Sequence, residues 1–493
     1  MIELHDGRQK ISEKKSDRLL WLGKLKAIIT VEPLIACYQM ALFLSKPALD
    51  NLEFEKTCRV NLKYNTTICD AILTGNHTGY KAENEEVQKI ISTMHSWQQP
   101  VQSFTPLILI LFLGSFSDRY KWRKPFLLMP IVGELFGIIG CILCVIFMQV
   151  LPLEAQGVSQ KIIPSFFGGQ TMLVMSTTAY IADVSSIKMR TLRLGVVQMV
   201  ISVVLPSVQA FSGIFFVKTG YLTVLFASMF LYVAALFYGF FWIKEVQHDA
   251  MKKCFLVDVF DPKHAKETFS LLVQKNEKND QLLIWILVLI SFLHRSAFDG
   301  ETNVLYLYTQ NVFQWTPLDY SYFLTVNSLV ALAGNLFGVP LFTEIFHFSD
   351  STILMITIAN KIVTNLFFGL AQDPQIFYTG VAVSVVTRIY RTAKKSIATK
   401  IVSRNDIGKA QSLLGISDVL APAISVPIYN KIIYLKTLHT FPAAFFFFSI
   451  ILYGISCVLV SVMYLRLHRR ENNLNLNPNT TSTQENVIET LHV

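Results

Sequence analysis

The chain has 493 residues, of which 52% are hydrophobic and only 16% charged, and its formal net charge is +9. Soluble proteins carry about 25% charged residues. Here the apolar residues recur in runs of about 20, the length that crosses a hydrocarbon core. The composition therefore excludes a soluble multi-domain enzyme and indicates a multi-pass protein of the lipid bilayer.

Twelve apolar segments are long enough to be membrane-spanning helices. They comprise residues 25–47, 98–117, 125–150, 160–184, 192–217, 219–243, 282–309, 320–343, 350–371, 374–398, 409–434 and 440–466. We predict an all-α membrane protein with twelve transmembrane helices in two six-helix bundles, residues 25–243 and 282–466, joined by a polar cytoplasmic linker at 244–281. Tails are predicted at 1–24 and 467–493, and the second is expected to be disordered because it is polar and poor in aromatic residues.

Clusters of lysine and arginine precede the first segment and follow the second, fourth, tenth and twelfth segments. Short loops rich in these residues stay on the cytoplasmic side of a membrane. With twelve spans, all five clusters fall on the same side. Both termini are therefore predicted to be cytoplasmic.

The connection at 48–97 is then expected to lie outside the cytoplasm. It contains two N-glycosylation sequons, at Asn65 and Asn76, which can be modified only on that face. It also contains Cys58 and Cys69. In an oxidising compartment this pair is expected to form a disulfide, and two free thiols are the alternative.

Charged residues inside the spans are candidates for function because each is costly in hydrocarbon. Glu32 stands beside Pro33, which is expected to kink the first span and free a carbonyl group. Glu32 then either lines a cavity or pairs with a neighbouring helix. Glu134 and Lys361, in the third and ninth spans, are expected to face the interior, where a pair between the two halves is one possibility.

The seventh span carries His294, Arg295, Asp299 and Glu301. Arg295 and Asp299 are four residues apart, so they lie on one helix face and can neutralise each other. Gly300 is expected to loosen the helix, as in the discontinuous helices of transporters. His294 has the one unperturbed pKa near physiological pH, which makes it the candidate for a proton relay. A histidine held only by hydrogen bonds is the alternative.

The tenth span carries four cations, Arg388, Arg391, Lys394 and Lys395, near its cytoplasmic end. They either extend toward the membrane surface under the positive-inside rule or form a basic wall for an anionic substrate. The sequence leaves both readings open.

Enzymatic motifs are absent from the sequence. It has no GxxxxGK[ST] phosphate-binding loop, no GxSxG, no HExxH and no Cys/His cluster with metal-ligand spacing. No catalytic residue, cofactor or metal site is therefore expected. The cations are spread over many loops, so a nucleic-acid surface is not expected either.

The loop after the second span, GSFSDRYKWRKP, is similar to the loop signature of the major facilitator superfamily. The matching residues are Gly114, Asp118, Arg119, Arg123 and Lys124. The resemblance implies a conformational gate rather than a catalytic or phosphate-binding loop. Lys121 and Trp122 occupy the place of a single glycine in the superfamily form, so the gate is expected to close with a different geometry.

Further motifs resemble the proton-coupled folate transporter family, solute carrier family 46. They are VEPL (31–34), ADVSS (182–186), RTLR (190–193), FLH (292–294) and TKIVSRNDIGKAQS (399–412). The resemblance covers nearly all of the chain except the tails and the linker. It implies a carrier that moves organic anions, often with protons, by rocking two bundles around a midplane site between spans one, four, seven and ten.

By this resemblance, His294 matches a histidine linked to proton coupling, and Asp183 matches the aspartate of the span-four motif. Gln198 stands where the folate carrier has a glutamate tied to coupling, and Gln198 does not titrate. Lys395 falls at the place of a substrate-linked arginine, which keeps the charge but loses the bidentate fork. These departures favour a wider substrate class, including folate-like compounds, muropeptides and cyclic dinucleotides.

The sequence thus predicts a secondary active transporter whose partners are a small organic anion, protons and the lipid bilayer. The alternatives are an uncoupled facilitator or channel and a membrane sensor that does not transport. The candidate pathway residues are Glu32, Asp183, His294, Arg295, Asp299, Arg391, Lys394 and Lys395. The plasma membrane is the expected location, with the endolysosomal membrane as the alternative, and the oligomeric state is left open.

Overall fold

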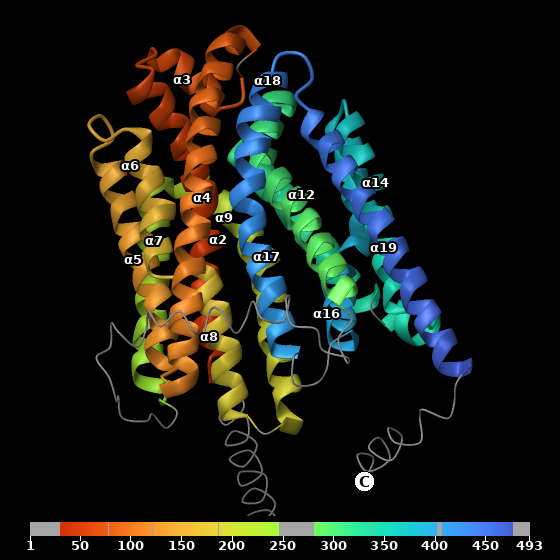
Figure 1. The fold of residues 1–493 in the computed structure, drawn as a ribbon. Helices are drawn as coiled ribbons and strands as arrows, with labels where there is room; N and C mark the ends of the chain where they lie inside the picture. Colours follow the sequence, from red (N-terminus) through yellow and green to blue (C-terminus); the bar gives the residue numbers. More distant parts are fainter. Residues whose placement is uncertain are drawn as a thin grey trace, which may run out of the picture. The chain divides into compact units, whose positions relative to one another are not determined.

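The computed structural model describes residues 30–76, 78–120, 122–185, 187–245, 281–338, 340–401 and 407–476. All regular elements within these ranges are helices (Figure 1). This confirms the predicted all-helical fold. The predicted N-terminal tail and nearly all of the linker lie outside the described residues.

The chain divides into two compact units. The first unit is Met1–Ala265 with Val304–Leu329, and the second unit is Lys266–Asn303 with Val330–Val493. Two helices contribute to both units: α12 (Gln281–Phe313) and α13 (Pro317–Ala333). The division therefore does not follow the chain order strictly.

The other helices of the first unit are α2 (Glu32–Lys56), η1 (Thr57–Asn61), α3 (Thr66–Leu73), η2 (Thr78–Tyr80), α4 (Lys81–Tyr120), α5 (Lys124–Ile146), α6 (Leu153–Gly157), η3 (Val158–Ile162), α7 (Ile163–Phe166), α8 (Gly169–Val184) and α9 (Ile187–Trp242). Helix α2 packs along α9, and α5 packs against both α8 and α9. Their apolar faces form one buried core that includes Leu34, Ile131 and Leu225. Burial of these side chains positions the polar groups described below.

The other helices of the second unit are η4 (Gly334–Gly338), η5 (Leu341–Ile345), α14 (Asp350–Leu370), α15 (Pro374–Val383), η6 (Ser384–Ile389), α16 (Tyr390–Lys400), α17 (Ile407–Pro427), η8 (Ile428–Tyr434), α18 (Leu435–Thr437) and α19 (Ala444–Leu476). Helices α14 and α19 run side by side (Figure 1). Ser349 caps α14 by accepting a hydrogen bond from the Thr352 amide, which satisfies one free donor of the first turn.

Several predicted spans are interrupted. Gly220 has a φ of +79° and breaks α9 at the junction of the fifth and sixth predicted spans. Gly168 and Gly169 also have positive φ and separate α7 from α8 within the fourth span. In the tenth span, the 3₁₀ segment η6 separates α15 from α16. A 3₁₀ stretch inside a helical span often marks a hinge or a functional region.

The predicted connection at 48–97 is largely helical, which corrects the expectation of a loop. Helix α2 continues to Lys56, and α4 begins at Lys81. Helix α19 likewise reaches Leu476, so the first part of the predicted disordered tail is helical. Hydropathy detects only the apolar part of a helix, and backbone hydrogen bonding continues into polar sequence beyond it.

Within the described residues, six helices have the length and apolar composition to cross a membrane. They are Lys124–Ile146, Arg193–Trp242, Gln281–Phe313, Asp350–Leu370, Leu413–Thr437 and Ala444–His468. Arg193–Trp242 alone covers two of the predicted spans. The chain is therefore a multi-pass membrane protein, while the count of twelve spans and their orientation remain predictions.

Candidate functional site

In the first unit, the structure joins two of the predicted site residues. Arg123, at the start of α5, donates a hydrogen bond from Nε to Oδ2 of Asp183, near the end of α8, at 2.6 Å. The Arg123 side chain is only 5% exposed. A charge buried to this extent requires a paired counter-charge. Arg123, in the second half of the loop signature, therefore binds Asp183, the aspartate of the span-four motif.

Glu245 also contacts the residues of this loop signature, although the sequence did not single it out. Its Oε1 accepts hydrogen bonds from the backbone amides of Arg123 at 2.8 Å and Lys124 at 3.2 Å. Lys124 donates from Nζ to the Phe240 carbonyl at 2.6 Å. A carboxylate at a helix N-terminus satisfies free amides and opposes the positive end of the helix dipole. A single glutamate at the end of an apolar run gives no periodic signal, so only the fold reveals it.

The remaining residues of the loop signature, Gly114, Asp118 and Arg119, lie in the last part of α4. Their backbone is helical, and their side chains lie outside the described part of the structure.

Glu32 occupies the first turn of α2, and the expected kink at Pro33 is wrong. Helix α2 begins at Glu32, so Pro33 lies in the first turn, where its missing N–H costs nothing. Glu32 is 3% exposed, and its Oε2 accepts a hydrogen bond from the Thr30 amide at 2.6 Å. Among the residues that the structure describes, its other oxygen, Oε1, has no hydrogen-bond partner. Arg193 contacts the same segment through hydrogen bonds to Thr30 and Ser185.

The first unit also contains two polar pairs that were not predicted. Lys46 and Asp50 form an ion pair at 3.1 Å on α2, and Glu53 Oε2 lies 3.1 Å from Nε2 of His95 on α4. The spacing of Lys46 and Asp50 is a detectable signal. The Glu53–His95 pair joins two helices and has no local signature.

In the second unit, His294 on α12 stacks on Tyr390, the first residue of α16. Their ring centroids are 3.5 Å apart and the planes are nearly parallel, while Tyr453 of α19 meets the imidazole edge-on at 5.4 Å. Within the described part of the chain, no hydrogen bond holds the imidazole. Its contacts are aromatic, unlike those of a histidine held in place by hydrogen bonds.

Directly after His294 on α12, Arg295 forms the predicted ion pair with Asp299, with Nε and Oδ2 2.5 Å apart. On α16, Arg391 and Lys395 are exposed, whereas Lys394 is buried. The four cations of the tenth span therefore do not share one environment. A uniform basic wall does not describe them.

Lys394 is the centre of a polar triad. Its ammonium donates to both Oδ atoms of Asp418 on α17, each at 3.1 Å, and to Oγ of Ser291 on α12 at 2.8 Å. Ser291 in turn donates to Oδ1 of Asp418 at 2.8 Å. Asp418 was not among the predicted residues, because it lies alone in an apolar segment far from Lys394 in sequence.

Glu301 on α12 belongs to a second buried cluster. It accepts hydrogen bonds from Lys361 Nζ at 2.9 Å and from Asn365 Nδ2 at 2.6 Å, both on α14. In the first unit, Glu134 accepts a hydrogen bond from the Tyr38 hydroxyl at 3.0 Å. Glu134 and Lys361 therefore each have a partner inside their own unit.

Gly300 does not interrupt α12, which is helical throughout. A Cβ at this position would lie 2.4 Å from the Tyr429 ring, so the glycine allows α12 and η8 to approach closely. The expected loosening at Gly300 is replaced by close packing.

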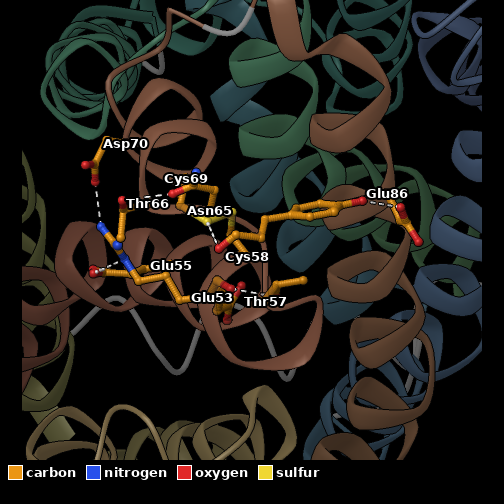
Figure 2. The surroundings of a disulfide bond; sticks show 11 residues. Glu53, Glu55, Thr57, Cys58, Asn65, Thr66, Cys69, Asp70 and Glu86 are labelled. Atoms are coloured by element: carbon orange, nitrogen blue, oxygen red, sulfur yellow. Dashed lines mark hydrogen bonds and ion pairs between the residues drawn. A yellow bond between two sulfur atoms is a disulfide. The ribbon is translucent and has the colours of Figure 1, made fainter.

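The predicted disulfide between Cys58 and Cys69 is present, with Cα atoms 5.7 Å apart (Figure 2). It joins η1, which follows α2, to α3. Arg59 adds ion pairs to Glu55 at 2.9 Å and Asp70 at 2.5 Å. The hydrogen bond from the Tyr64 hydroxyl to Glu86 raises the pKa of Tyr64 to about 12.

The sequon residues Asn65 and Asn76 are both exposed. Among the described residues, no group of three or more His, Cys, Asp or Glu side chains could hold a metal ion.

The chain belongs to the major facilitator superfamily, because the model of the Major Facilitator Superfamily matches residues 86–386, more than half of its length. Proteins of this superfamily are transporters, not enzymes. The chain is also distantly homologous to members of solute carrier family 46, which agrees with the motif resemblance.

Three relatives describe this homology. A probable peptidoglycan muropeptide transporter of Drosophila melanogaster is 25% identical, covering 90% of this chain and 86% of the relative. A lysosomal proton-coupled steroid conjugate and bile acid symporter of Gallus gallus is 22% identical, and the match covers 88% of this chain and 95% of the relative. The proton-coupled folate transporter of Rattus norvegicus is 22% identical, covering 88% and 91%.

Among solved structures, the human organic anion transporter MFSD10 is similar with a TM-score of 0.62. The match covers 88% of this chain and 99% of that one, at 14% sequence identity. At this identity the likeness establishes the fold.

Proposed function

We propose that this protein is a secondary active transporter that moves an organic anion by alternating access and couples that movement to protons. One observation carries the proposal. His294 stacks on Tyr390, and the ammonium of Lys394, the centre of the triad, lies 5.7 Å from the same ring, with the exposed cations Arg391 and Lys395 on the same helix. The cluster combines cations that attract an anion with an imidazole and a carboxylate, two side chains that can bind and release protons. The relatives named as proton-coupled transporters of organic solutes support it.

The proposed substrate class is folate-like compounds, muropeptides or cyclic dinucleotides. All are anions that a lysine or arginine can bind by charge-assisted hydrogen bonds. Arg391 and Lys395 are the proposed contacts, Asp299 holds Arg295 in position, and Glu32 is a further pathway candidate. Bile acids enter as test substrates because one relative is named for them.

The proposed topology has twelve transmembrane helices in two six-helix bundles, residues 25–243 and 282–466, with both termini in the cytoplasm. The segment at 48–97 would then be extracellular or lumenal, and Asn65 and Asn76 would carry glycans. The plasma membrane is the proposed location, and the endolysosomal membrane is the alternative.

In this proposal the loop between α4 and α5 is a cytoplasmic gate. Asp118 and Arg119 end α4, and Arg123 binds Asp183. Asp118→Asn is expected to change the transport rate far more than the choice of substrate. Competition uptake with a folate and a muramyl peptide measures both, and an altered substrate profile would contradict the gate.

The central test is uptake into cells or proteoliposomes across external pH from about 5 to about 8, the range in which histidine titrates. A labelled folate, a muramyl peptide and a bile acid serve as probes. His294→Ala removes both the titrating group and the stack on Tyr390, whereas His294→Phe keeps an aromatic ring. If His294 relays protons, both variants lose rate at acidic pH. If only His294→Ala does, the role is packing.

Two rival functions have their own outcomes. Gln198, exposed on α9, cannot titrate, which favours an uncoupled facilitator. Uptake that never exceeds equilibrium under a pH gradient would support that rival. Binding of a probe without flux in proteoliposomes would instead support a membrane sensor.

A further inference from the structure

We propose that Asp418 is a proton-operated latch on Lys394, and that Lys394 binds the anionic group of the substrate only after Asp418 is protonated. This inference rests on the proposed function and adds the residue on which proton and substrate binding are linked. In this inference Lys394 is the cation that binds the substrate, and Asp418 competes with the substrate for Lys394.

The hydrogen bonds of Lys394 explain why the lysine is locked in this structure. An ammonium group has three N–H donors and no acceptor. Here three acceptor atoms surround it, the two carboxylate oxygens of Asp418 and Oγ of Ser291. The Ser291 hydroxyl donates its proton to Asp418. The Ser291 oxygen is therefore oriented to accept a hydrogen bond from Lys394. No donor of Lys394 is left for a substrate while Asp418 is ionised.

The two partners differ in access. The Lys394 side chain is 8% exposed, whereas the Asp418 side chain is 37% exposed. A proton can therefore reach the carboxylate without the lysine leaving its buried position. Once Asp418 is neutral, Lys394 is a buried charge without a counter-charge, a state that costs several kcal/mol. An anionic substrate group removes this cost.

The exchange conserves the charge of the cluster. Before it, one carboxylate faces one ammonium. After it, a neutral carboxyl group and a bound anion face the same ammonium. Proton binding and anion binding therefore favour each other, and thermodynamic linkage requires the effect to be equal in both directions. This is the relation that symport needs.

The neighbouring charged groups fit this role. On α16, Tyr390 and Arg391 face Asp418, and on α12 Asp299 lies within electrostatic range with its partner Arg295. Asp299 is already engaged with Arg295 on the same helix. The two arginines add positive potential that attracts an anion when Asp418 is neutral. His294 lies against the ring of Tyr390.

A second set of the same residue types provides the matched control. Asp350 binds Lys400 Nζ at 2.5 Å and accepts a hydrogen bond from Ser396 at 2.7 Å. The difference that matters for the control is burial, because the Lys400 side chain is 68% exposed whereas that of Lys394 is 8% exposed. Asp350→Asn therefore makes the same chemical change without freeing a buried cation.

The first experiment measures equilibrium binding of the same folate, muramyl peptide and bile acid to the purified full-length protein at acidic and neutral pH. The protonated fraction of a carboxyl group falls about tenfold for each pH unit above its midpoint. We therefore expect wild type and Asp350→Asn to bind markedly more tightly at acidic pH. Asp418→Asn should bind equally tightly at both pH values, near the acidic wild-type affinity. A wild-type pH profile in Asp418→Asn would overturn the latch.

The second experiment needs no substrate, so it separates failure of the latch from failure of the proposed function. A carbodiimide reacts with protonated carboxyl groups, and mass spectrometry reports the labelling of Asp418. The latch predicts labelling at acidic pH and little at neutral pH, with a severalfold increase at neutral pH in Lys394→Gln. If Asp418 stays unlabelled at acidic pH, or if Lys394→Gln changes nothing, the latch is overturned. If labelling follows the prediction but wild type binds no probe, the proposed substrates are wrong and the latch stands.

Discussion

Arg123 and Asp183 form a buried ion pair with Nε and Oδ2 2.6 Å apart, although 60 positions separate them in sequence. The pair connects the loop signature after α4 to the end of α8. Both residues belong to recognisable motifs, but neither motif predicts that the two side chains are in contact. Their contact is a defined ion pair that substitutions can remove.

Asp183→Asn should destabilise the protein by about 3 kcal/mol, because it removes the negative charge that Asp183 places against the buried Arg123 guanidinium. Arg123→Met combined with Asp183→Asn should recover most of this loss. The backbone amides at Arg123 and Lys124 keep their bonds to Glu245 in every variant. Thermal melting in detergent, with both single variants and the double variant, measures the coupling. Additive losses would show that the pair contributes nothing.

Glu301→Gln should be more harmful than its size suggests. It keeps an acceptor for Asn365 but leaves the buried Lys361 ammonium uncompensated, at a cost of about 3–5 kcal/mol. Glu301→Gln with Lys361→Met should be more stable than Glu301→Gln alone. Asp350→Asn is the control, because its lysine partner is exposed and such pairs contribute about 0–1 kcal/mol. Equal melting temperatures for Glu301→Gln and Asp350→Asn would contradict this account.

Gly300→Ala should lower stability by about 1–3 kcal/mol, because the new methyl group overlaps the Tyr429 ring. Gly454→Ala on α19 meets no atom within 4 Å and should be neutral or slightly stabilising, since alanine favours the helix. Tyr429→Leu should relieve the effect of Gly300→Ala. If Gly300→Ala and Gly454→Ala have the same melting temperature, Gly300 has a role other than close packing.

Removal of the disulfide by Cys58→Ser should cost about 3 kcal/mol, the value expected for a loop of this length. The measurement is the melting temperature with and without a reducing agent. The reducing agent should lower the melting temperature of wild type and leave that of the variant unchanged. Unpaired Cys141→Ser serves as the control thiol.

The sequons test the topology. Asn65→Gln and Asn76→Gln should each reduce the electrophoretic shift caused by a glycosidase, and the double variant should show none. A wild-type protein from a glycosylating host that shows no shift would place the segment at 48–97 on the cytoplasmic side.

Most of the helical architecture could be read from the sequence, because a bilayer requires long apolar runs whose backbone groups are satisfied within the helix. The Arg295–Asp299 pair was also readable, since residues four apart on a helix are neighbours by geometry. What hydropathy missed was the polar continuation of α2, α4 and α19, because hydrogen bonding along a helix does not depend on hydrophobicity.

The sequence by itself determined the superfamily motifs, the helical segments and the residue types of the candidate site. Only the tertiary structure decided which charges meet: Arg123 with Asp183, Glu301 with Lys361, and Lys394 with Ser291 and Asp418. Such pairs depend on the rotation and tilt of each helix, which the packing of side chains along its whole length sets. A local pattern of residues contains no information about that rotation.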